Sequence, residues 1–105
     1  MAFVKVADIR DLPPGEVMEY ERGFESYAIC NVEGEIRAVW GSCPHHGGPL
    51  GQGGLQGGMI TCPWHMWPFD SATGECGLNP AVKIPVYKVR VVGDAVEVDL
   101  PDEDA

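Results

Sequence analysis

The chain has 105 residues, enough for one domain with a small core. It carries 16 acidic and seven basic side chains, which give a formal net charge of -9. This charge argues against nucleic acid as a partner, because phosphate binding needs clustered Lys and Arg. It favours electrostatic steering toward a basic patch on another protein.

The N-terminal residues 1–14 carry several charges and have no apolar run, so they do not resemble a secretory signal. No segment approaches the length of a membrane span, and no membrane association is expected. We therefore expect a cytoplasmic protein whose thiols stay reduced. Of the four cysteines, Cys30 and Cys76 lie outside any motif and are expected to be free, buried apolar side chains.

The first part of the chain predicts short strands separated by turns. Pro13, Pro14 and Gly15 end the first strand, and Glu33-Gly34 between two apolar runs is typical of a β-hairpin. The expected strands are residues 3–6, 16–21, 26–32 and 35–40.

The second part begins with a glycine-rich segment, residues 41–58, which has neither a helical nor a strand period. It predicts a loop with one brief strand at its end. Residues 59–61 then lead into the second ligand loop, residues 62–65. Later strands are expected at 84–92 and 95–100, with a strand end and turn at 69–74 and a turn at Gly93-Asp94. The fold class is therefore all-β, small antiparallel sheets in a barrel-like sandwich, with one domain over residues 1–100 and a mobile acidic tail at 101–105.

Two short loops carry the metal-ligating residue types: Cys43-Pro44-His45, and Cys62-Pro63-Trp64-His65 after a spacer of sixteen residues. Zinc sites with two Cys and two His normally pair Cys with Cys and His with His, whereas each loop here is mixed. A mixed loop suits a binuclear centre in which each loop gives its Cys to one iron and its His to the other. A zinc site and a Cys43–Cys62 disulfide remain as alternatives.

This pattern resembles the Rieske-type ferredoxins, in particular the ferredoxin component of bacterial multicomponent aromatic-ring dioxygenases. The flanking sequences Gly47-Gly48-Pro49-Leu50 and Thr73-Gly74-Glu75 agree with it. The resemblance implies two cluster-binding loops at one end of the fold and one [2Fe–2S] cluster per chain. It places Cys43 and Cys62 on the inner iron and His45 and His65 on the outer iron, which takes the electron.

Three further residues are interpreted through the same resemblance. His46 is a competing ligand, but the family spacing points to His45 and leaves His46 beside the cluster. Pro80 matches a third loop that covers the cluster, although an ordinary turn proline is an equal alternative. Met66, directly after His65, stands where the family normally has Gly.

The sequence also predicts a low reduction potential. High-potential relatives carry a disulfide and hydroxyl donors around the cluster. Here Gly48 and Trp64 occupy the disulfide positions, and Trp67 and Phe69 occupy those of the hydroxyl donors. Without these donors the reduced cluster is stabilised less.

The resemblance implies an electron carrier, not an enzyme, that takes electrons from a flavin-dependent ferredoxin reductase and passes them to a terminal oxygenase. The chain cannot build the mononuclear iron site of an oxygenase, since only His46 remains after cluster ligation. The glycine-rich run fails the dinucleotide fingerprint at Gln56. A monomer is expected. The alternatives are a Rieske-like small subunit of an assimilatory nitrite reductase and a Cys2His2 zinc-binding interaction module.

Overall fold

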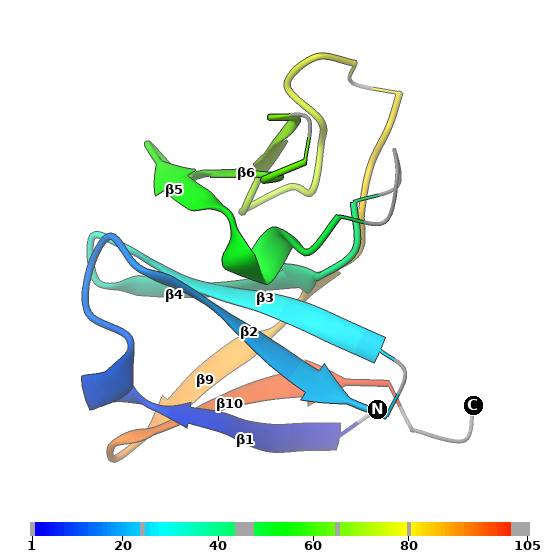
Figure 1. Cartoon of the computed structure of the whole chain (residues 1–105). Coiled ribbons are helices and arrows are strands. Elements are labelled where there is room, and N and C mark those ends of the chain that lie inside the picture. Colours follow the sequence, from blue (N-terminus) through cyan, green and yellow to red (C-terminus); the bar gives the residue numbers. More distant parts are fainter. Residues whose placement is uncertain (1, 24, 44–47, 65, 80, 102–105) are drawn as a thin grey trace.

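The computed structural model of the chain describes residues 2–23, 25–43, 48–64, 66–79 and 81–101. Within these ranges the chain forms short strands and two 3₁₀ turns, and no described helix is long and apolar enough to cross a membrane. The strands make three small antiparallel sheets (Figure 1). The all-β fold class predicted from the sequence is confirmed.

The first sheet has the order β1-β10-β9 and is formed by both ends of the described chain. It contains β1 (Ala2–Asp8), β9 (Val89–Val92) and β10 (Ala95–Leu100), and the 3₁₀ turn η1 (Ile9–Asp11) follows β1. In β10, Val96, Val98 and Leu100 are fully buried while the alternate residues are half-buried. This period of two means that one face of the sheet packs inward.

The central sheet has the order β2-β3-β4-β8 and is covered on both faces. It comprises β2 (Val17–Arg22), β3 (Glu25–Val32), β4 (Glu35–Trp40) and β8 (Val86–Tyr87). In β3, Tyr27 and Ile29 belong to the core shared with the first sheet. Ala28 and Cys30, which point to the opposite face, belong to a second core that contains Cys43 and Cys62. The central sheet is thus the platform between the two cores.

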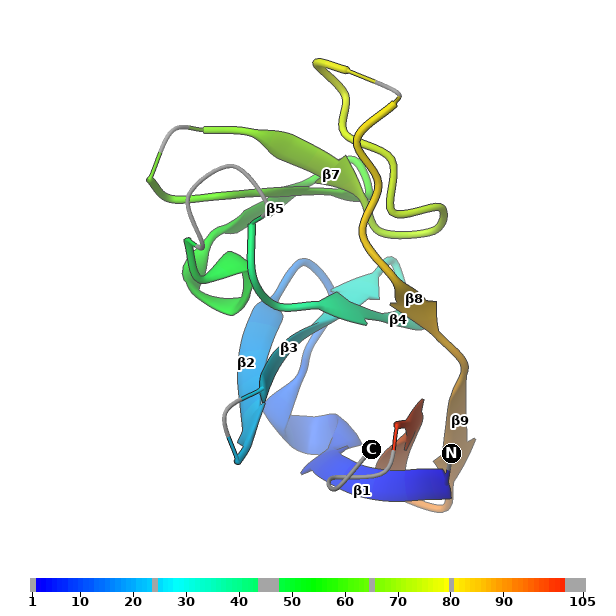
Figure 2. The same cartoon turned by 90° about the vertical axis from the view of Figure 1, so that its right-hand side faces the viewer.

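The third sheet, β5-β6-β7, lies on the side of this platform away from β1, β9 and β10 (Figures 1 and 2). Its strands are β5 (Gly54–Gln56), β6 (Met59–Thr61) and β7 (Pro68–Asp70), and the 3₁₀ turn η2 (Leu50–Gln52) precedes it. This turn packs tightly on β2, because a Cβ atom at Gly51 would lie 2.5 Å from the Cβ atom of Glu19. The side-chain amide of Gln52 also donates to the Glu19 carboxylate (3.1 Å).

Most of the predicted strands are confirmed, and β4 and β10 have the expected bounds. The single strand expected at 84–92 is wrong. Strand β8 pairs with β4, strand β9 pairs with β10, and Lys88 lies between them. The chain leaves one sheet here and joins another, which the local alternation of side chains does not reveal.

The first residue of the C-terminal segment, Pro101, is held by a hydrogen bond. The guanidinium of Arg22 donates to the carbonyl oxygen of Pro101 (3.0 Å), which places this residue against the end of β2. The rest of the predicted mobile tail, residues 102–105, lies outside the described residues.

Candidate metal centre

The second ligand loop connects β6 to β7, and backbone hydrogen bonds define its shape. The register Thr61↔Pro68 ends the ladder, and the N–H of Cys62 then donates to the carbonyl oxygen of Trp67 (2.9 Å). Within the loop, the N–H of Met66 donates to the carbonyl oxygen of Cys62 (2.9 Å). Cys62 is only 1% exposed. The β6–β7 hairpin therefore presents a buried thiol at a fixed position at its tip.

The first ligand loop follows β4 and is closed in a similar way. The N–H of Cys43 donates to the carbonyl oxygen of Gly48 (2.9 Å), and Ser42 and Pro49 form an isolated β-bridge. Below this bridge, the N–H of Leu50 donates to the carbonyl oxygen of Gly41 (2.8 Å). Cys43 is 2% exposed, so this loop also carries its thiol inside the protein.

Gly48 is the point at which the two loops meet. A Cβ atom at Gly48 would lie 2.5 Å from the Sγ atom of Cys62 and 3.3 Å from two ring atoms of Trp64. Any larger residue would therefore collide with the second loop, and glycine permits this close approach. The structure brings the two cysteine-bearing loops together through Gly48, one of the residues singled out in the sequence.

All four cysteines of the chain are described, and none of them forms a disulfide. Cys30 and Cys76 are 0% and 2% exposed, which confirms the prediction that they are buried. Burial raises the pKa of the Cys30 thiol, and this effect outweighs the opposing hydrogen bond with Ser71. A thiol that resists deprotonation is a poor metal ligand. Cys30 also lies within a regular strand, whereas Cys43 and Cys62 lie where strands give way to loops.

The remaining predicted site residues divide into two groups. His45, His46, His65 and Pro80 lie outside the described residues. Among the residues that are described, no group of three or more His, Cys, Asp or Glu side chains could hold a metal ion. Of the four ligands predicted from the sequence, the structure describes Cys43 and Cys62.

The two described thiols fit an iron–sulfur centre by their chemistry. They come from different loops, both are nearly inaccessible to water, and Gly48 of the first loop lies against Cys62 and the ring of Trp64. Thiolate is the ligand that iron–sulfur clusters require, and coordination to iron would keep these buried sulfur atoms deprotonated. Two of the four predicted ligands therefore have suitable burial and position.

The two tryptophans of the second loop have different surroundings. Trp67 is half-buried against the core that contains Cys43 and Cys62, and its carbonyl oxygen accepts the hydrogen bond from Cys62. Trp64 is 56% exposed, with its ring next to Gly48. Trp67 thus supports the loop from inside, while Trp64 covers it at the surface.

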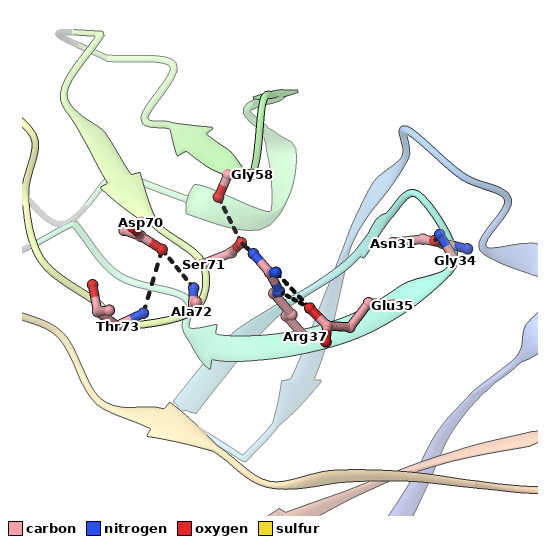
Figure 3. Close-up of polar contacts among 9 residues, drawn as sticks. All are labelled: Asn31, Gly34, Glu35, Arg37, Gly58, Asp70, Ser71, Ala72 and Thr73. Carbon is pink, nitrogen blue, oxygen red and sulfur yellow. Dashed lines mark hydrogen bonds and ion pairs between the residues drawn. The ribbon is translucent and has the colours of Figure 1, made fainter.

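A polar contact that sequence reasoning missed fixes the base of the β6–β7 hairpin (Figure 3). The buried hydroxyl of Ser71 donates to the carbonyl oxygen of Gly58 (2.5 Å), which joins the two ends of the hairpin. The guanidinium of Arg37 on β4 donates to the same hydroxyl (3.1 Å) and also pairs with Glu35. Arg37 and Ser71 are 34 residues apart, so no local pattern in the sequence indicates the contact. It anchors the second ligand loop to the central sheet.

We expect Ser71→Ala to lower the free energy of unfolding by about 1–2 kcal/mol, because two hydrogen bonds of a buried hydroxyl are lost. Urea unfolding followed by circular dichroism measures the change. Thr73→Ala is the matched control, since the Thr73 hydroxyl accepts one hydrogen bond at an exposed turn (3.2 Å). Equal urea midpoints for Ser71→Ala and Thr73→Ala would show that the hydrogen bonds of Ser71 to Arg37 and Gly58 do not stabilise the fold.

Comparison with protein families gives one match that spans most of the chain. The family model described as the Rieske [2Fe–2S] domain matches residues 2–88. The ferredoxin component of biphenyl 2,3-dioxygenase from Rhodococcus jostii (strain RHA1) is 37% identical over 101 residues, which cover 95% of this chain and 94% of that protein. The similarity therefore runs over nearly the full length of both proteins.

Solved structures with the same fold include two kinds of protein. A complex of reduced oxygenase and oxidised ferredoxin in carbazole 1,9a-dioxygenase contains a chain that matches with a TM-score of 0.84 and 31% identity, over 91% of both chains. An NADH-dependent nitrite reductase small subunit from Mycobacterium tuberculosis matches with a TM-score of 0.81 and 25% identity, over 92% of this chain and 93% of that one. The fold alone does not separate these two kinds.

Proposed function

This chain belongs to the Rieske [2Fe–2S] domain family, and from that premise we propose that it is the electron-carrying ferredoxin of a multicomponent aromatic-ring oxygenase. Relatives of nearly the same length are ferredoxin components of such systems, carriers rather than catalysts. The cofactor of the family is one Rieske-type [2Fe–2S] cluster. When bound, it accepts and releases one electron at a time.

We assign the cluster to the thiolates of Cys43 and Cys62 and to the imidazoles of His45 and His65. The observation that supports this most is the close approach of Gly48 in the first loop to the Sγ atom of Cys62 in the second. Both cysteines are shielded from water, since each is at most 2% exposed. Gly48, Trp64 and Trp67 shape the site around them, and His46 and Pro80 are assigned beside it from the sequence.

The proposed partners are a flavin-dependent ferredoxin reductase, which supplies electrons, and a terminal oxygenase, which receives them. The structure of a 31% identical ferredoxin with its oxygenase supports the second partner. We further propose that the carrier is a cytoplasmic monomer whose contacts with each partner are small and short-lived, because it must dock and leave at every turnover.

Reconstitution with the cognate reductase and oxygenase tests the proposal. Aromatic product should form at a rate that depends on the concentration of this chain and should stop when the chain is omitted. Turnover that is unchanged without the chain would refute the carrier role.

A nitrite reductase small subunit is the second candidate, favoured by the structural match to such a protein. A subunit of this kind would remain bound to a large partner, whereas a carrier would elute alone. Size-exclusion chromatography of the native protein separates the two. Metal analysis addresses the remaining zinc alternative, because only a cluster contains iron with acid-labile sulfide.

We expect a low reduction potential, near the lower limit of about -150 mV for Rieske centres. The side chains at the positions of the hydroxyl donors, Trp67 and Phe69, offer no hydroxyl to the cluster, and Phe69 is fully buried. A redox titration followed by visible circular dichroism measures the potential. A value well above zero would contradict the expectation.

A further inference from the structure

The charged residues of this acidic chain are absent from one long segment. Residues 41–69 contain no Asp, Glu, Lys or Arg, so all 16 acidic and all seven basic side chains lie before or after them. This segment includes both ligand loops, β5 and β6, and it forms most of the end of the molecule opposite β1, β9 and β10 (Figure 2). The segment that carries both ligand loops is thus uncharged in a protein with a net charge of -9, and the nearest charged residue after it is Asp70.

The same end exposes large apolar side chains. Met66 (69%), Leu78 (65%) and Trp64 (56%) have the highest exposed fractions among the large apolar residues described. Trp64 and Met66 belong to the second ligand loop. Leu78 follows Gly77, whose N–H donates to Pro68 at the other end of that loop (2.8 Å). All three therefore come from segments next to the candidate centre.

Met66 combines an unfavourable backbone conformation with an exposed side chain. Its φ angle is +59°, in the left-handed region that glycine adopts at a lower cost. Gly would satisfy the same hydrogen bond to Cys62 without strain. The Met side chain instead lines a shallow groove of about 540 Å³ together with Pro63 and Leu55. No charged residue lines this groove, whose polar lining includes Gln52 and Gln56.

We propose that Trp64, Met66 and Leu78 form an apolar docking face for the terminal oxygenase, and that the acidic residues outside residues 41–69 steer the partner toward it. This inference rests on the proposed function. The cores of protein interfaces are depleted of charge and enriched in aromatic residues and Met, which matches this face. The oxygenase is the occupant because a similar ferredoxin has been solved in complex with one.

The distribution of charge along the chain indicates what kind of surface the partner should present. The acidic chain attracts a basic surface over a distance of about one Debye length, roughly 8–10 Å at physiological ionic strength. At the contact itself no carboxylate of residues 41–69 is available to form an ion pair. The partner should therefore present an apolar centre with its basic residues at the rim. A small contact of this kind also suits rapid release.

The test uses the holoprotein in the reconstituted system, with two variants of the docking face and one control. Met66→Asn replaces the apolar side chain and keeps the left-handed backbone, which Asn tolerates. Leu78→Asn is the second change. Val92→Asn is the matched control, because Val92 is 55% exposed but lies on β9 at the opposite end.

The double variant Met66→Asn/Leu78→Asn should raise the concentration of ferredoxin that half-saturates oxygenase turnover by about tenfold. The maximal rate, the visible spectrum and the reduction potential should stay at the wild-type values. The rise should be similar at low and physiological ionic strength, since no charge is changed. Val92→Asn should stay within about twofold of wild type.

Three results would overturn the docking face: a wild-type half-saturating concentration in the double variant, an equal effect of Val92→Asn, or an effect that disappears with added salt. A different result would show that the proposed carrier function itself is wrong. In that case the wild-type chain, with its cluster spectrum intact, would support no turnover.

Discussion

Replacing Cys43 or Cys62 with alanine is expected to abolish incorporation of the [2Fe–2S] cluster. Each replacement removes one of the two thiolates that we assign to the centre, and the remaining ligands cannot complete four-coordinate iron. Because metal binding and folding are coupled, the variants should also unfold at lower denaturant concentration. Iron and acid-labile sulfide per chain, with the visible spectrum of the purified protein, measure the loss.

Cys76→Ala provides the matched control for Cys43→Ala. Both residues are 2% exposed and belong to the same core, so each substitution removes the same volume from a similar environment. Cys76→Ala should keep the wild-type iron content and lose only about 1 kcal/mol of stability. The ligand assignment would be wrong if Cys76→Ala lost as much iron as Cys43→Ala, or if Cys62→Ala kept its full content.

Much of the fold could be predicted because local sequence signals coincide with local structure. Glu33-Gly34 joins β3 and β4, and both of these residues have the positive φ angles of a tight hairpin turn. The alternation in β10 reports its buried face directly. The break at Lys88 could not be predicted, since the strand pattern continues through it and only the pairing partner changes. Pairing depends on the whole fold rather than on neighbouring residues.

The candidate site was predictable in part for the same reason. The spacing of Cys43 and Cys62 within their loops indicated the cysteines, and the structure brings those loops together at Gly48. The sequence placed Gly48 beside the first ligand loop by resemblance, but it did not show that Gly48 lies against Cys62 while Gly54 has open space around it. The anchor between Arg37 and Ser71 likewise depends on residues that meet only after folding. Contacts between distant segments are therefore what the structure adds.

Gly53→Ala is expected to destabilise the third sheet by about 3 kcal/mol. A Cβ atom at Gly53 would lie 1.8 Å from the carbonyl oxygen of Thr61, a backbone atom of β6 that cannot rotate away. The φ angle of Gly53 is -84°, which any residue adopts, so the collision alone causes the effect. Thr61 directly precedes Cys62, and relief of the collision would displace the second ligand loop. Cluster content should therefore fall together with stability.

Gly54→Ala makes the same chemical change one residue further along. Its added Cβ would meet nothing within 4 Å, and Gly54 is exposed on β5. Replacing a glycine where the backbone allows it reduces the entropy of the unfolded chain, so this variant should be stabilised by about 0.4–1 kcal/mol. Urea unfolding of the two holoproteins, followed by far-ultraviolet circular dichroism and by the visible absorbance of the cluster, measures both effects. Coinciding midpoints for Gly53→Ala and Gly54→Ala would show that the backbone at Gly53 does not lie against the carbonyl oxygen of Thr61. Opposite shifts would establish that the contact of Gly53 with Thr61 holds the second ligand loop in place.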